Sequence, residues 1–212
     1  MAGVLRRGQL PRSRIDVAAK LLAAPWLLHL DVFRPQLNQQ LSGRSRPDLI
    51  GQTESGQWLS FESKGRVSTP SAKAKNKAKQ QAERCISVNG TPLTYHIGGI
   101  MYFKDDVPHF FWRDPTPQRH PSNAIVVSLS DDVWRHYYLP VLELVRSDAQ
   151  VFMRMLQDPI LLSLAHLDIE VGVFPSVLKF LSISQWAKAR EWCGHNSSEL
   201  DSKGYHRDGI QV

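Results

Sequence analysis

The spacing of apolar residues changes several times along the first half of the chain, and each change predicts a different element. Residues 15–31, "IDVAAKLLAAPWLLHLD", have the spacing of a helix that bends or ends near Pro25. From Ser45 the period becomes two, so "PDLIGQ" and "QWLSFES" are predicted to be strands joined by the turn "TESG". The strong helix formers of "SAKAKNKAKQQAERC", residues 71–85, predict the next helix.

The pattern that follows predicts more strands and then a helical region. "LTYHIGGIMYF" and "HFFWRD" are expected to be strands, and Gly98 and Gly99 mark a place where the backbone passes close to another element. "AIVVSLS" is expected to be the last strand of the core. The aromatic residues of "HFFWRD", Phe110, Phe111 and Trp112, are expected to be core residues rather than a stacking surface. Helices are predicted near residues 131–138, 141–157, 159–166 and 175–193.

This order of elements predicts the fold class and the division into domains. Helix, strand, strand, helix, strand, strand is typical of an α/β core with a mixed central sheet flanked by helices. The segment "RDPTPQRHPSN", rich in proline and polar residues, is a candidate boundary. With "AIVVSLS" counted as part of the core, the first domain is expected over residues 1–130 and a helical extension over residues 131–195. The polar residues 196–212 are expected to form a flexible tail.

Positive charge is concentrated beside the predicted hairpin. The chain of 212 residues has a formal net charge of +6. Residues 60–90 contain seven Lys or Arg side chains against Glu62 and Glu83, so most of the net charge lies in this one segment. Such a concentration favours an anionic partner.

Hydropathy and cysteine usage indicate the cellular compartment in which the protein is expected. No apolar run approaches the roughly 20 residues that a membrane span needs, so no membrane partner is expected. Cys85 and Cys193 do not form a C-x-x-C motif and are typical of a reducing compartment. We therefore expect a cytoplasmic protein, although the arginine-rich start leaves an organellar presequence open.

Three charged residues are expected to meet at the hairpin. Glu62 and Lys64 are two residues apart on one strand, so their side chains project from the same face, and Asp48 can reach that place from the neighbouring strand. Two converging carboxylates are costly to bury unless a cation lies between them. Such ligands suit Mg²⁺, which leaves room for water and a substrate phosphate, and a neighbouring lysine can assist the attack of water. The pattern indicates a metal-dependent phosphodiester hydrolase.

The same residues resemble a known signature. "RPD" at 46–48 and "ESK" at 62–64, separated by thirteen residues, are similar to the motif of the PD-(D/E)XK nuclease superfamily, which includes restriction endonucleases and Holliday-junction resolvases. The resemblance covers about residues 15–130 and implies a restriction-endonuclease-like core. It also implies that Asp48, Glu62 and the carbonyl oxygen of Ser63 hold Mg²⁺, for which Mn²⁺ can substitute, and that Lys64 is the catalytic lysine.

Two further positions follow from the resemblance. Many members carry another acid on the first helix, for which Asp16 and Asp31 are both candidates. Some members carry a glutamine on the helix after the motif, and we prefer Gln81 to Gln80 because it shares a face with the apolar residues of the predicted helix.

The predicted helix after the motif suggests how a nucleic acid is held. Its basic residues Lys73, Lys75, Lys77 and Lys79 are expected to contact phosphates, with DNA preferred to RNA as the ligand, which makes the protein a Mg²⁺-dependent deoxyribonuclease. Two alternatives stay open: a nuclease-like fold that binds nucleic acid or protein without cleavage, and a surface hairpin on which Glu62 and Lys64 form only an ion pair. The C-terminal helices offer a surface for a homodimer or a protein partner.

Overall fold

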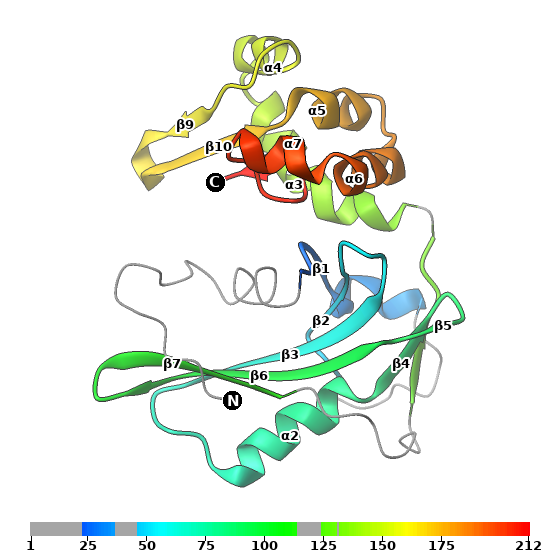
Figure 1. Cartoon of the computed structure of the whole chain (residues 1–212), viewed down its shortest axis with the longest axis vertical. Helices are drawn as coiled ribbons and strands as arrows, with labels where there is room; N and C mark the ends of the chain where they lie inside the picture. The colour runs from blue at the N-terminus through cyan, green and yellow to red at the C-terminus, as the bar shows by residue number, and fades with distance from the viewer. Residues whose placement is uncertain (1–22, 37–45, 114–123, 131) are drawn as a thin grey trace. The chain divides into compact units, whose positions relative to one another are not determined.

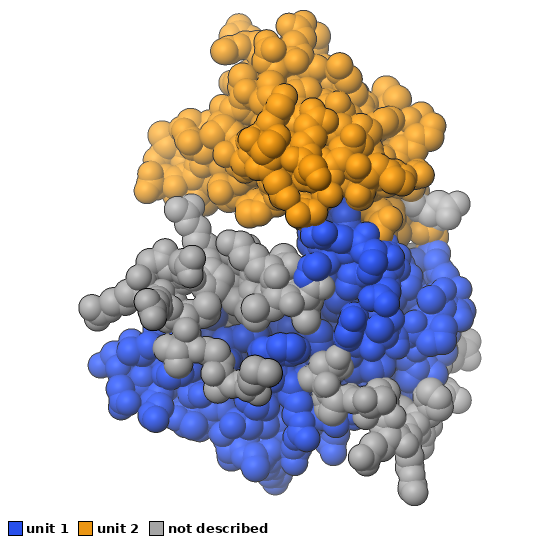
Figure 2. Space-filling model, in the orientation of Figure 1, with its two compact units in different colours: residues 1–129 blue, residues 130–212 orange. Residues whose placement is uncertain are grey.

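The structure is a computed structural model that describes residues 23–36, 46–113, 124–130 and 132–212 (Figure 1). The chain forms two compact units, Met1–Leu129 and Ser130–Val212, which are coloured separately in Figure 2. The division falls next to the boundary expected after residue 130.

The first unit is built on a mixed sheet of five strands in the order β1-β2-β3-β6-β7. These strands are β1 (Trp26–His29), β2 (Leu49–Gln52), β3 (Trp58–Arg66), β6 (Tyr95–Lys104) and β7 (Val107–Arg113). All neighbours are antiparallel except β3 and β6, which are parallel and are connected through helix α2 (Ala72–Ala82). The expected α/β class with a mixed sheet and flanking helices is therefore confirmed.

The hairpin predicted around the three charged residues is present. Strand β2 pairs with β3 in the register that places Leu49 opposite Phe61 and Gln52 opposite Trp58. The turn between them contains Gly56 at φ +82°, a backbone conformation that glycine adopts without a steric penalty. The alternating sequence pattern predicted both strands, although the structure buries both faces of β2 and of the first half of β3.

The helix expected over residues 15–31 is wrong where the structure describes that range. Residues 26–29 form strand β1, which pairs with β2 and is followed by the 3₁₀ helix η1 (Leu30–Gln36). "WLLH" is a short apolar run, and such a run has the same pattern in a buried strand and in a buried helix. Residues 15–22 lie outside the described residues.

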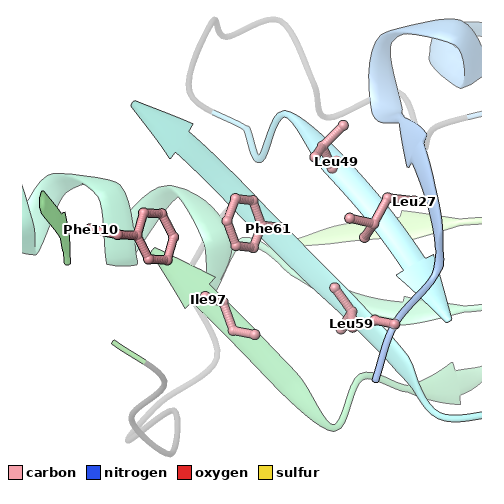
Figure 3. Packing of buried hydrophobic residues seen from close by; sticks show 7 residues of the cluster. Leu27, Leu49, Leu59, Phe61, Ile97 and Phe110 are labelled. Carbon is pink, nitrogen blue, oxygen red and sulfur yellow. The ribbon is translucent and has the colours of Figure 1, made fainter. Parts of the chain in front are cut away.

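A cluster of apolar side chains packs on one face of the sheet, and Figure 3 shows seven of them, six of which are labelled. They come from five different strands or their flanks and are nearly all excluded from solvent: Ala24, Leu27, Leu49, Leu59, Phe61, Ile97 and Phe110. Phe110 thus lies in the core, as expected, while Phe111 lies on the opposite face of the sheet, where the ammonium of Lys75 is 4.5 Å from the centre of its ring.

Helix α2 covers the other face of the sheet. Ser71 caps its N-terminus by accepting a hydrogen bond from the backbone N–H of Ala74, which satisfies one of the free donors of the first turn. The helix is shorter than expected, because Cys85 already belongs to strand β4. Its backbone passes very close to Gly98, where an added Cβ would lie 2.6 Å from the backbone nitrogen of Lys79. The close approach expected at the glycine pair is confirmed.

A second, smaller sheet completes the first unit. It has the order β5-β4-β8, with β4 (Cys85–Val88), β5 (Thr91–Pro92) and β8 (Ile125–Val127). Asn89 and Gly90 connect β4 to β5 and both have positive φ, as a two-residue turn with the twist of a hairpin requires. The strand expected at "AIVVSLS" is thus present, but it pairs with β4 and not with the main sheet.

The second unit combines helices with a small antiparallel sheet. Its helices are α3 (Val133–Arg146), α4 (Ala149–Met155), α5 (Pro175–Ser182), α6 (Trp186–His195) and α7 (Ser197–Ser202), with the 3₁₀ helix η2 (Ala165–Leu167). Its strands β9 (Leu162–Leu164), β10 (Ile169–Val173) and β11 (Ile210–Gln211) form a sheet in the order β11-β10-β9. No described helix of the chain is long and apolar enough to span a membrane.

Several predictions for this unit are wrong. The helix expected over residues 159–166 is strand β9 and the start of η2, because the short apolar run "ILLSLA" does not distinguish a strand from a helix. Residues 196–212 are not a flexible tail: they form α7 and β11, and Leu200 is fully buried. A buried Asp208 also accepts a hydrogen bond of 2.5 Å from the hydroxyl of Tyr137. Most residues of this segment are polar, and the few that are buried do not form a recognisable pattern, so the sequence predicted a solvent-exposed tail.

The close packing of α2 on β6 yields the first prediction. We expect Gly98→Ala to destabilise the first unit by about 1–3 kcal/mol, because backbone atoms of α2 cannot move aside as the end of a side chain can. Urea unfolding followed by tryptophan fluorescence measures the change.

Gly194→Ala is the control for this substitution. Gly194 lies in α6 with no atom within 4 Å of an added Cβ, so alanine should be neutral or slightly stabilising. Equal stability of wild type and Gly98→Ala would show that α2 can shift away from the sheet at little cost.

Candidate active site

The hairpin brings the three predicted charged residues to one place. Asp48 directly precedes β2, and one of its carboxylate oxygens accepts a hydrogen bond of 2.9 Å from the backbone N–H of Ser63. Glu62 and Lys64 project from the face of β3 that α2 covers, and the Lys64 ammonium donates a hydrogen bond to Glu62 Oε1. The two carboxylates and the ammonium therefore converge as the sequence predicts.

Glu62 is the buried member of this group. Only 2% of the residue is exposed, whereas Asp48 is exposed and Lys64 is partly exposed. Burial raises the pKa of the Glu62 carboxyl, the hydrogen bond from Lys64 lowers it, and the negative charge of Asp48 raises it further. The result is a raised pKa, so the ionised carboxylate lacks part of the compensation that a buried charge needs.

Two buried carboxylate or amide oxygen atoms of the first unit have no hydrogen-bond donor among the described residues. They are Glu62 Oε2 and the side-chain oxygen of Gln81. A buried acceptor without a partner costs roughly 1–3 kcal/mol, and native structures rarely retain one without a reason. Oxygen atoms of this kind are ligands for a hard cation, so the donor set of the site fits Mg²⁺.

Helix α2 places Gln81 over the strand that carries Glu62. The hydroxyl of Ser60 donates a hydrogen bond of 2.7 Å to the carbonyl of Ala82, which fixes the end of α2 over β3. Gln81 lies on the buried face of the helix, while Gln80 is exposed. The structure thus places the preferred glutamine toward the sheet and the other toward solvent.

The backbone of Ser63 faces Asp48. In a strand the N–H and C=O of one residue point toward the same neighbouring strand, and the Ser63 N–H bonds to Asp48. The paired residues of β2 begin at Leu49, so the Ser63 carbonyl lies past the described ladder, on the Asp48 side. The Ser63 carbonyl therefore points to the side of β3 on which Asp48 lies, and its role as a backbone ligand stays a prediction.

The acid expected from the first helix is only partly accounted for. Asp16 lies outside the described residues. Asp31 lies in the 3₁₀ helix η1, directly after Leu30. The backbone N–H of Leu30 donates a hydrogen bond of 2.9 Å to the backbone carbonyl of Asp48. The carboxylate of Asp31 is exposed and forms an ion pair of 2.5 Å with Arg46. From the sequence no role was assigned to Arg46, although its position two residues before Asp48 indicated that it lies near the site.

The four lysines of α2 do not form one surface. Lys75 lies over the Phe111 ring of β7, and Lys79 forms an ion pair of 3.2 Å with Glu83. Lys73 and Lys77 are exposed and lie roughly half a turn away from these two. Since Phe111 belongs to β7, the edge of α2 that carries Lys77 and Gln81 is the one turned away from β7.

The described residues contain no group of three or more His, Cys, Asp or Glu side chains that could hold a metal ion. Asp48 and Glu62 alone supply two carboxylates, and Mg²⁺ is commonly held by one or two carboxylates with water and phosphate in the other positions.

Comparisons of the chain with protein-family models, with curated proteins and with solved structures find no match.

The unsatisfied oxygens predict that a metal ion stabilises the protein. We expect Mg²⁺ or Mn²⁺ at about 100 times its dissociation constant to raise the unfolding temperature by on the order of 5–10 °C. The shift should disappear in Asp48→Asn and Glu62→Gln and should persist in Asp105→Asn, which changes an exposed carboxylate of the same unit. Differential scanning calorimetry measures all four proteins.

The pH dependence of this shift follows from the raised pKa of Glu62. A proton and the metal compete for the same carboxylate, so the thermal shift should decrease as the pH falls through that raised pKa. Without metal the sign is opposite: stability from the neutral carboxyl is present at low pH and is lost as the pH rises through the raised pKa. A metal-induced shift that is equal in wild type and Glu62→Gln would remove Glu62 from the ligand set.

Proposed function

We propose that the first unit is a metal-dependent nuclease with a restriction-endonuclease-like core, which hydrolyses phosphodiester bonds of DNA. The observation that carries the proposal is the buried Glu62, whose second oxygen has no hydrogen-bond donor within the described part of the chain, beside Asp48 and Lys64 on one face of the sheet. Burial of a carboxylate with an open coordination position is costly for stability and useful for holding a cation.

The residues of the site have separate roles in this proposal. Asp48, Glu62 and the Ser63 carbonyl would hold Mg²⁺, and Gln81 would orient a water or substrate oxygen from the side of α2. A bound ion would lower the pKa of the water that it binds and would neutralise negative charge on the phosphate oxygens. Lys64 would turn from Glu62 toward the scissile phosphate, where its ammonium assists the attack of water and stabilises the developing charge. The 3′ oxygen would leave and a 5′-phosphate end would remain.

The basic groups near the site support an anionic polymer as the substrate. Lys73 and Lys77 are exposed on the side of α2 that is turned away from β7. Contacts between lysines and phosphates release counterions and bind DNA without regard to sequence. These two lysines are therefore better placed to hold the strand at the site than Lys75 and Lys79, which already contact Phe111 and Glu83.

One observation favours a second candidate function. The ammonium of Lys64 already bonds Glu62, so a cation partner for this carboxylate is present without any metal. A module that binds nucleic acid and does not cleave it could keep this ion pair as a structural element. The two candidates differ in the fate of Lys64, because only the nuclease requires it to leave Glu62.

Cleavage assays distinguish the two candidates. We expect the wild-type protein to cut linear, circular or single-stranded DNA with Mg²⁺ and not with EDTA. Asp48→Asn and Glu62→Gln should abolish single-turnover cleavage, and Lys64→Ala should slow it by roughly 10²-fold or more. Lys188→Ala, which removes an exposed lysine in α6 of the second unit, is the matched control and should cut at the wild-type rate.

A wild-type protein that binds these substrates and leaves them intact in Mg²⁺ and Mn²⁺ would establish the binding module. Cleavage that is equally fast in Lys64→Ala would contradict the role given to this lysine. RNA substrates in the same assay test the preference for DNA.

The two sides of α2 predict different salt dependence. Lys73→Ala with Lys77→Ala should reduce the slope of log affinity against log salt by up to about 1.8 for duplex DNA, since each lost phosphate contact contributes about 0.9. Lys75→Ala with Lys79→Ala is the charge-matched control and should change the slope less. Fluorescence anisotropy over a salt series measures both slopes, and equal slopes in all three proteins would make the lysines a solvated face.

A further inference from the structure

A row of polar and aromatic side chains crosses the sheet one step beyond Lys64. Arg66 of β3 pairs with Tyr102 of β6, and Tyr102 pairs with His109 of β7. Directly paired residues share a face, and so do residues two apart on one strand. All three side chains therefore lie on the same face of the sheet as Lys64, at the closed end of the β6–β7 hairpin.

The row is accessible and contains an aromatic stack. The rings of Tyr102 and His109 are 5.3 Å apart and only 20° from parallel. Both residues are half-buried and Arg66 is exposed. Figure 1 shows why: the closed end of the hairpin extends past the first turn of α2, so the helix that covers Glu62 does not reach this row.

A structural reading of the stack is that it stabilises the hairpin as a cross-strand pair. That reading does not explain the surroundings. Arg66 is the partner of Tyr102 on the neighbouring strand. Phe111, two residues after His109 on β7, has the ammonium of Lys75 4.5 Å from the centre of its ring. Aromatic rings next to basic groups, open to solvent, are the means by which proteins hold unpaired bases, because every base has a π face.

We propose that Arg66, Tyr102 and His109 bind an unpaired nucleobase of the strand whose phosphate is held at Asp48, Glu62 and Lys64, an inference that rests on the proposed function. Lys64 and Arg66 are two residues apart on β3, a distance of about 7 Å along the strand. A base attached next to the scissile phosphate can therefore reach the row. The base continues the stack of Tyr102 and His109, and Arg66 contacts the neighbouring phosphate or the base face.

Charge at the hairpin limits the path of the strand. Asp105 and Asp106 lie at the turn, both exposed, and repel a phosphate backbone that would cross the tip. Lys73 lies at the start of α2, on the side of the helix turned away from Phe111. The backbone is therefore expected to run along α2 and past Arg66, with the base directed onto the rings. Such a site favours single-stranded or locally unpaired DNA over intact duplex.

A base-dependent binding assay tests the proposal. The probes are a fluorescent dT12 and a twelve-residue abasic strand with the same phosphates, measured by anisotropy with the full chain in Ca²⁺, with strand integrity checked on a gel. We expect wild type to bind dT12 roughly tenfold or more tightly than the abasic strand, which is the size of one stacked base. Tyr102→Leu should remove this preference and leave the affinity for the abasic strand unchanged.

Two further variants make the result specific. Tyr102→Phe keeps the ring and should retain the preference for dT12. Phe103→Leu removes an aromatic ring of the same hairpin that is 50% exposed on the opposite face, and it should change nothing. Should Tyr102→Leu fail to fold, as judged by its unfolding temperature, His109→Leu is the replacement variant and should also abolish the preference.

The proposal is overturned when wild type binds the two strands equally or binds neither, or when the preference survives the loss of the ring. It is also overturned when the leucine variant weakens both strands alike, since that result indicates a structural or purely electrostatic role. A base-dependent preference in a wild-type protein that cuts no substrate would support this site and contradict the nuclease, so the two proposals can fail independently.

Discussion

The cost of burying the Glu62 carboxylate is the constraint on which the site of the first unit depends. A carboxylate held away from water needs a positive partner and donors for both of its oxygens. Lys64 satisfies one oxygen, and the other has no donor among the described residues. The negative charge of Asp48 raises the pKa of Glu62 by more than a backbone hydrogen bond from Asp48 lowers it. This arrangement disfavours the metal-free state and, for the same reason, increases the free energy that a bound cation would contribute.

The close packing of α2 produces this burial. Gly98 lies next to Glu62 across β3 and β6 and has no side chain, so the helix backbone can approach the sheet directly. Ala78 and Ala82 keep the contacting face of the helix small, and the hydroxyl of Ser60 bonds the carbonyl of Ala82. A larger residue in this seam would move α2 outward and admit water to Glu62. The close contacts of α2 with Gly98 and Ser60 therefore also exclude water from the Glu62 carboxylate.

The sequence was most informative where independent signals agreed. Alternation, the glycine turn and the spacing of Asp48 and Glu62 all indicated one hairpin, and the structure has that hairpin. Strand β1 and strand β9 were missed because short apolar runs do not identify their own backbone conformation, which is determined by the strand that pairs with them. The order in residues 196–212 depends on a few buried side chains such as Leu200, whose partners lie far away in the sequence. The orphan oxygen of Glu62 could not be predicted at all, because it results from the position of α2.

The ion pair between Lys64 and Glu62 has different meanings in the two candidate functions. In a binding module it is a permanent contact, and the uncompensated second oxygen of Glu62 remains an unexplained cost. In a nuclease the contact would belong to the metal-free state. Asp48 and Glu62 would hold a divalent cation, whose charge would compensate the carboxylates in place of the ammonium of Lys64. The lysine would then be free to turn along β3 toward a phosphate, in the direction of Arg66 and the aromatic row. The nuclease therefore accounts for the unsatisfied oxygen, the partly exposed lysine and the basic groups beside it through one electrostatic change, which is the reason for preferring it.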